Sequence, residues 1–128
     1  MGIKFQEVDS EELKELFCDM KYDYVKCANL FYLSSGLRDK VTFASNYTVD
    51  CARKEFDDKP DSVRCIISND SGDIVGIVEY GIVNTLGESD FCIVSCLYIK
   101  DEYSDCNYGT LVLQRFKEYY GDAAYWIV

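Results

Sequence analysis

The sequence of 128 residues contains no histidine and only one proline, Pro60. Without histidine, Ser-His-Asp and Cys-His catalysis, imidazole metal ligation and a histidine pH switch are all excluded. Acid–base chemistry must therefore come from carboxylates, tyrosine, lysine or cysteine. With eight glycines and 48% hydrophobic residues, the chain is neither collagen-like nor of low complexity. We expect one compact domain over residues 1–128.

Positive charge is scarce as well. The chain carries 13 Lys and Arg against 23 Asp and Glu, a formal net charge of −10. Nucleic-acid-binding domains present basic surfaces, so this composition excludes direct binding to a phosphate backbone. The imbalance is uneven, because residues 61–128 hold only 4 of the basic side chains but 11 of the acidic ones. The C-terminal half is therefore the more acidic one.

Long apolar runs are also missing. No stretch approaches the ~20 apolar residues that cross a bilayer, and the opening MGIKFQEVDS lacks the apolar core of a signal peptide. Gln6 stands where a myristoylation motif requires serine or threonine. We expect a cytoplasmic protein with no membrane attachment.

Cysteine is abundant by comparison, with seven residues and no CxxC pair. An odd number in a chain without a signal peptide predicts reduced thiols. Cys92 and Cys96 are the closest pair, and two ligands are too few for zinc. We interpret the cysteines as small hydrophobic core residues and expect no metal site.

The first half of the chain predicts one strand followed by helices. Residues Lys4–Val8 form a strand pattern, and Asp9 with Glu12 resembles a capping box. Apolar residues at helical spacing predict a first helix, and a second helix over Tyr22–Leu33 ends at a Ser-Ser-Gly sequence. A further helical piece follows a possible cap at Thr48.

The second half predicts strands around one helix. Val63–Ser68 and Ile74–Val83 flank turn-forming residues and predict a β-hairpin, and the apolar run Phe91–Ile99 predicts a covered strand. A helix over Tyr108–Tyr120 leads to a last strand, Ala123–Val128, which we expect to pair in parallel through a right-handed crossover.

The predicted order is β-α-α-β-β-β-α-β, an α+β fold with a mixed sheet. Ligands of such sheets bind beyond the carboxyl end of a strand, where a helix N-terminus points. Here that place is the loop Lys100–Gly109. The motif Leu97-Tyr98-Ile99-Lys100-Asp101-Glu102-Tyr103, followed by Gly109-Thr110-Leu111-Val112-Leu113, resembles the GCN5-related N-acetyltransferase (GNAT) superfamily, shortened after the fifth strand.

The resemblance implies an acetyl-CoA-dependent N-acetyltransferase acting on an amine, or on a protein lysine or N-terminus. It places the pantetheine and acetyl groups on the backbone of Leu97 and Ile99. It implies that the phosphates bind to a loop and helix start that contain Ser104, Asn107, Gly109 and Thr110. This loop departs from the family pattern, because Ser104 replaces the expected Arg or Gln, Asp105 and Asn107 replace glycines, and a carboxylate repels a pyrophosphate.

Two carboxylates are candidate general bases, Glu79 in the middle of a strand and Asp90 before the next one. Flanking apolar residues predict that Glu79 is partly buried, with a raised pKa. The alternative is that Glu79 lies on a wet sheet face without a catalytic role. No tyrosine stands out as the general acid.

A different class of function stays open. A GNAT-fold protein that has lost its cofactor would act as an acidic binding protein, inhibiting or regulating a partner such as a nucleic-acid-handling enzyme, in the manner of phage antagonists. The apolar last strand, Tyr125–Val128, leaves an edge that we expect to pair with a second copy or a protein partner.

Overall fold

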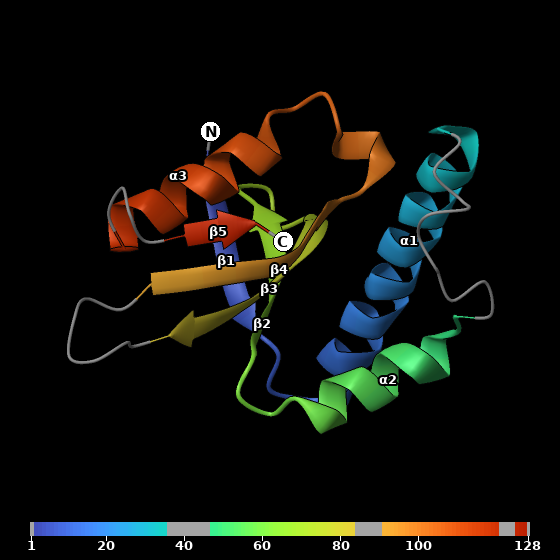
Figure 1. The fold of residues 1–128 in the computed structure, drawn as a ribbon. Coiled ribbons are helices and arrows are strands. Elements are labelled where there is room, and N and C mark those ends of the chain that lie inside the picture. The colour runs from blue at the N-terminus through green and yellow to red at the C-terminus, as the bar shows by residue number, and fades with distance from the viewer. Residues whose placement is uncertain (1, 36–46, 84–90, 121–124, 128) are drawn as a thin grey trace.

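The computed structural model describes residues 2–35, 47–83, 91–120 and 125–127. Its five strands form one sheet in the order β1-β2-β3-β4-β5 (Figure 1). Strands β1 to β4 pair antiparallel, and β5 pairs with β4 in parallel, which confirms the predicted parallel pairing. The strands are β1 (Ile3–Glu7), β2 (Val63–Asn69), β3 (Ile74–Val83), β4 (Phe91–Ile99) and β5 (Tyr125–Ile127).

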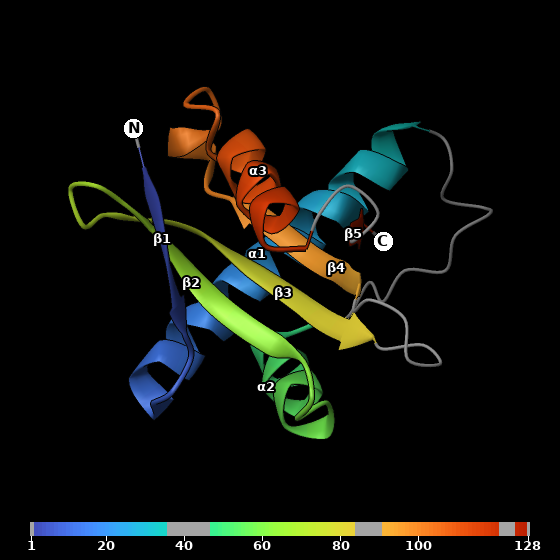
Figure 2. The same cartoon turned by 90° about the vertical axis from the view of Figure 1, so that its left-hand side faces the viewer.

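The helices cover both faces of the sheet. Helices α1 (Glu11–Ser35) and α2 (Val49–Asp58) lie on one face, and α3 (Tyr108–Tyr120) lies on the other (Figure 2). The predicted order of elements is confirmed, but the division of the first helices is wrong. The two helices expected before Gly36 are one continuous helix, α1, and the piece after Thr48 is the second helix.

The helix starts show why these segments begin where they do. The Ser10 hydroxyl accepts a hydrogen bond from the Leu13 N–H at 3.2 Å, so Ser10 rather than Asp9 caps α1. Thr48 caps α2 as predicted, accepting from the Cys51 N–H at 3.3 Å.

The β2–β3 hairpin is confirmed, and its turn is built by two residues. The Asn69 side chain accepts hydrogen bonds from the N–H groups of Ser71 and Asp73. Gly72 has a φ of 86°, a backbone conformation that favours glycine.

Two apolar cores follow from the alternation of side chains along the strands. On β2, Cys65 and Ile67 join the core under α3, while Ile66 joins the core under α1 and α2. Four of the seven cysteines are buried as predicted, whereas Cys27 and Cys106 are exposed and Cys51 is half-buried. All seven are free thiols.

On β4, the alternation of side chains between the two faces of the sheet is interrupted by a β-bulge. Glu79 pairs with Cys96 and Tyr80 with Val94, so Ser95 is an extra residue on β4. Before the bulge Val94 packs under α3, and after it Cys96 packs under α1 and α2. The bulge therefore changes which side chains in the second half of β4 point toward α3 and which point toward α1 and α2.

Within the described residues, no helix is long and apolar enough to cross a membrane. Among the same residues, no group of three or more cysteine, aspartate or glutamate side chains is placed to hold a metal ion.

Candidate functional site

The described pairing of β4 with β5 covers only the first half of β4. Their register runs from Cys92 opposite Tyr125 to Val94 opposite Ile127. From Ser95 to Ile99, β4 has no partner on the β5 side among the described strands. Among the described residues, the first half of β4 therefore has a strand on each side, whereas the second half has one only on the β3 side; we call its other side the open edge.

The backbone direction at this edge follows from one hydrogen bond. The Lys100 N–H donates to the Val75 carbonyl at 2.9 Å, so it points toward β3. Backbone groups alternate sides along a strand, which turns those of Ile99 and Leu97 toward the open edge. These are the two residues that the sequence predicts for the pantetheine arm, and they offer it strand-like hydrogen bonds.

The loop after β4 folds back on itself before α3 begins. A short 3-10 helix, η1 (Asp101–Tyr103), is followed by a further turn. The Ser104 N–H and hydroxyl both bond to the Asp101 carbonyl, and the Cys106 N–H donates to the Tyr103 carbonyl. These donors are hydrogen-bonded within the loop, so the Ser104 hydroxyl is not available to donate to a phosphate.

The start of α3 is better suited to an anion. Asn107 has a φ of 62°, the left-handed conformation, and its carbonyl accepts from the Leu111 N–H at 3.1 Å. The N–H groups of the first helical turn, which includes Gly109 and Thr110, have no partners within a helix and carry its positive dipole end. A Cβ on Gly109 would meet nothing within 4 Å, so the fold itself does not require glycine there.

The charges around this loop oppose a pyrophosphate. Asp101, Glu102 and Asp105 are exposed, and Lys100 stands against them with Glu102 at 3.9 Å from its ammonium. The edge of β4 thus fits the pantetheine arm of acetyl-CoA. The loop fits the phosphates only through the backbone at the start of α3.

Glu79 lies on the other side of the bulge, facing α1 and α2. It is 6% exposed, so the predicted burial is confirmed and the alternative of a wet sheet face is wrong. Its Oε1 accepts a hydrogen bond from Lys21 Nζ at 2.6 Å, and its Oε2 accepts one from Arg64 Nε at 2.7 Å. The Ser95 hydroxyl, on the bulge, donates to the Glu79 carbonyl at 3.2 Å. One buried carboxylate therefore joins α1, β2, β3 and β4.

The predicted rise in the Glu79 pKa is wrong. Burial does raise it, but the hydrogen bond and charge of Lys21, with those of Arg64, outweigh burial and lower the pKa. The same pair raises the pKa of Lys21, although burial acts to lower it. Glu79 is consequently ionised and strongly held, which makes it a weak acceptor of a proton.

The sequence analysis missed Lys21, Arg64 and Ser95. Arg64 and Glu79 are direct partners across the hairpin, but a β-bulge between Ile67 and Ser68 shifts the register by one residue, so a count from the turn places Val78 opposite Arg64 and misses the pair. Lys21 comes from a distant helix, and the bulge at Ser95 has no clear sequence pattern. Asp90, the other predicted base, lies outside the described residues.

Tyrosines near the loop are packed. Tyr108, the first residue of α3, is buried, with its hydroxyl 3.3 Å from the Asn69 amide nitrogen, and the rings of Tyr103 and Tyr108 lie edge to face. Tyr98 packs edge to face against Tyr24.

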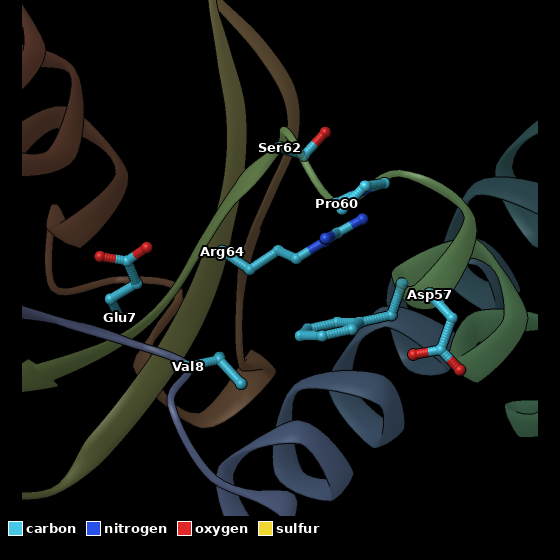
Figure 3. A pocket seen from close by; sticks show the side chains of 7 residues that line it. Glu7, Val8, Asp57, Pro60, Ser62 and Arg64 are labelled. Carbon is cyan, nitrogen blue, oxygen red and sulfur yellow. The ribbon is translucent and has the colours of Figure 1, made fainter.

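Three of the cavities that the described residues form adjoin the α1 and α2 face. The first, of about 300 Å³, lies between α2 and the start of β2, with the Arg64 side chain reaching toward Pro60 (Figure 3). The guanidinium of Arg64 lies over the Phe56 ring at 4.3 Å. A second, of about 470 Å³, continues past Asp57 to the start of α1. A third, of about 380 Å³, contains Lys21, Glu79 and Ser95, at the bulge.

Comparison with solved structures places this arrangement among acetyltransferases. A possible acetyltransferase from Clostridium difficile 630 is similar with a TM-score of 0.67 and 11% identity, covering 100% of this chain and 80% of that one. A GNAT family acetyltransferase from Staphylococcus aureus has a TM-score of 0.62 at 13% identity, covering 100% and 87%. Glucosamine-6-phosphate N-acetyltransferase from Arabidopsis thaliana has a TM-score of 0.53 at 12% identity, covering 100% and 82%.

No protein-family model matches the sequence, and no curated protein matches it either. The chain has the fold of the GNAT superfamily, as the motif around Leu97 and Gly109 predicts. Identities of this size establish the fold, and the chemistry has to be argued from the site.

Proposed function

We propose that the protein is an acyltransferase that moves an acetyl group from acetyl-CoA to a primary amine. The observation that carries the proposal is the open edge of β4 from Ser95 to Ile99, which starts beside a cavity holding a buried ion cluster. The acetyltransferases of the same fold support it.

The donor, acetyl-CoA, would bind to the second half of β4 and to the start of α3. Leu97 and Ile99 would bind the pantetheine arm through their backbone, as a sheet edge binds an added strand. The first turn of α3, at Gly109 and Thr110, would orient the phosphates, with Ser104 and Asn107 shaping the loop before it.

When bound, acetyl-CoA supplies a thioester whose acyl carbon bonds to the amine nitrogen while the carbon–sulfur bond breaks and its electron pair stays on sulfur. In the cavity at the bulge, water takes the proton that the nitrogen loses. Glu79 acts as a positioning residue that fixes Lys21 and Ser95 beside the acceptor, since two cations hold its carboxylate. Asp90 stays the predicted general base, which would receive the proton from this water.

Asp105→Asn tests the donor site. Removing this exposed carboxylate from the loop relieves repulsion of the pyrophosphate, so we expect acetyl-CoA to bind about five-fold more tightly. Asp61→Asn is the matched control, because it makes the same change in net charge at an exposed site outside the loop. Calorimetric titration measures both affinities. The donor site is contradicted by the absence of binding to all three proteins at millimolar acetyl-CoA, or by equal gains in both variants.

The second candidate is an acidic binding protein that does not use acetyl-CoA. The observation that favours it is the excess of carboxylates on the loop, at Asp101, Glu102 and Asp105. The same titration separates the two candidates, since this function predicts that acetyl-CoA does not bind.

A further inference from the structure

The cavity at the bulge differs in charge from the other two. The cavity of Figure 3 is lined by two carboxylates and one guanidinium. Its neighbour at the start of α1 is lined by three carboxylates and one ammonium. In the cavity at the bulge the balance is reversed, with Lys21 and Lys59 against Glu79. A protein with a net charge of −10 thus keeps a small cationic cavity.

The ion pairs behind this cavity match two cations with two carboxylates and leave Lys59 as the cation of the lining without a described ion pair. Arg64 Nε lies 2.7 Å from Glu79 Oε2, so one guanidinium already balances the carboxylate. The Lys21 ammonium shares the other oxygen of Glu79 and has Glu55 at 3.9 Å. Lys59 is exposed and has no ion pair within the part of the chain that the structure describes.

Hydroxyl groups complete the lining. Ser62 and Ser95 lie on opposite sides of the ion cluster, on the approach to β2 and on the bulge of β4. A hydroxyl can donate to an anion as readily as it accepts. A volume of about 380 Å³ is within the range of small-molecule sites. The Ser95 hydroxyl already donates to the Glu79 carbonyl, so the cavity offers an anionic molecule the Lys59 ammonium, the Ser62 hydroxyl and space.

The cavity lies next to the open edge of β4, where we propose that acetyl-CoA binds. Ile93 and Ser95 line it, and Ser95 is the residue at which β4 leaves β5. A molecule in the cavity consequently lies beside the start of the edge that includes Leu97 and Ile99.

We propose that this cavity selects the acceptor, and that the acceptor is a small primary amine bearing a carboxylate or phosphate group. The inference rests on the proposed acetyl transfer for the fate of the amine. Lys59, with the hydroxyl of Ser62, binds the anionic group, and Lys21, paired with Glu79, adds a second ammonium to the lining. The amine end is left to face the edge of β4.

Binding is tested without the donor, by amide chemical shifts in the 15N-labelled protein. The probes are β-alanine, O-phosphoethanolamine and neutral ethanolamine. We expect at least one of the anionic probes to shift the amides of Ser62, Gly81 and Ser95, and ethanolamine to leave them in place. Lys59→Gln should weaken this binding about five- to ten-fold, whereas Lys54→Gln, which removes an exposed charge of α2 outside the cavity, should not.

The relative response to carboxylate and phosphate identifies the anion. The proposal is overturned if neither anionic probe shifts these amides, if ethanolamine shifts them equally, or if Lys59→Gln binds as the unmodified protein does.

Transfer is tested separately, by thiol release from acetyl-CoA with each amine and with 1,3-diaminopropane. The proposal predicts a kcat/KM at least ten-fold higher for an anionic amine than for ethanolamine, with the advantage reduced in Lys59→Gln. Faster transfer to the diamine overturns the acceptor class and leaves the acyltransferase in place. Anion binding without transfer to any amine supports the anion site and contradicts the acyltransferase.

Discussion

At the scale of single residues, the buried carboxylate of Glu79 dominates the energetics of the site. It is 6% exposed and Arg64 is 4% exposed, and each satisfies the other. Removing one member of such a pair leaves an uncompensated buried charge, which costs more than the pair contributes. The residue proposed from the sequence as a base is therefore also a structural centre.

Glu79→Gln should lower the free energy of unfolding by about 3 kcal/mol, because Arg64 and Lys21 lose their buried counter-charge. Glu55→Gln is the matched control, since Glu55 is more exposed and lies 3.9 Å from Lys21, and should cost under about 1 kcal/mol. Urea denaturation followed by circular dichroism measures both. Equal small losses in the two variants would show that the Glu79 pairs do not stabilise the fold.

The lowered pKa of Glu79 predicts how stability depends on acid. A carboxyl whose pKa is lower in the folded state stabilises fully above its unfolded pKa, about 4.3, and loses that contribution as pH falls through the folded pKa. The unmodified protein should therefore lose more stability than Glu79→Gln between pH 5 and pH 2. Urea midpoints across this range test the point, and parallel curves for the two proteins would contradict it.

At the scale of elements, the sequence predicted those with strong periodicity. The apolar run of β4 and the helical spacing of α3 have the predicted bounds, and the hairpin follows from its turn residues. The continuity of α1 was missed because its apolar stripe does not show whether the axis bends. The bulge at Ser95 and the pairing of Lys21 with Glu79 depend on contacts between distant segments, which local pattern does not encode.

The close pairing of β3 and β4 depends on one glycine. A Cβ on Gly76 would overlap the Tyr98 carbonyl oxygen, so Gly76→Ala must push the strands apart and should cost about 1–3 kcal/mol of stability. Gly81→Ala on the same strand is the control, because a Cβ there meets nothing within 4 Å. Thermal denaturation of the two variants compares them. A Gly76→Ala protein as stable as Gly81→Ala would mean that β3 and β4 are not so closely packed.

At the scale of the whole molecule, the fold favours the proposed binding of acetyl-CoA, whereas the net charge opposes it. The chain shares its fold with acetyltransferases, and the donor that we propose, acetyl-CoA, is polyanionic, whereas a net charge of −10 with an acidic loop disfavours such a donor. The account reconciles the two by giving the pantetheine arm, rather than the phosphates, the main contacts, along the open edge of β4. A second copy or a protein partner at the outer edge of β5 stays a prediction of the sequence.

The most direct measurement is the map of amide chemical shifts when acetyl-CoA is added to the 15N-labelled protein. The account predicts that the shifted amides cluster on the second half of β4, at Leu97 and Ile99, and at the start of α3, at Gly109 and Thr110. Shifts confined to other surfaces, or none at millimolar acetyl-CoA, would contradict the donor site and with it the acyltransferase.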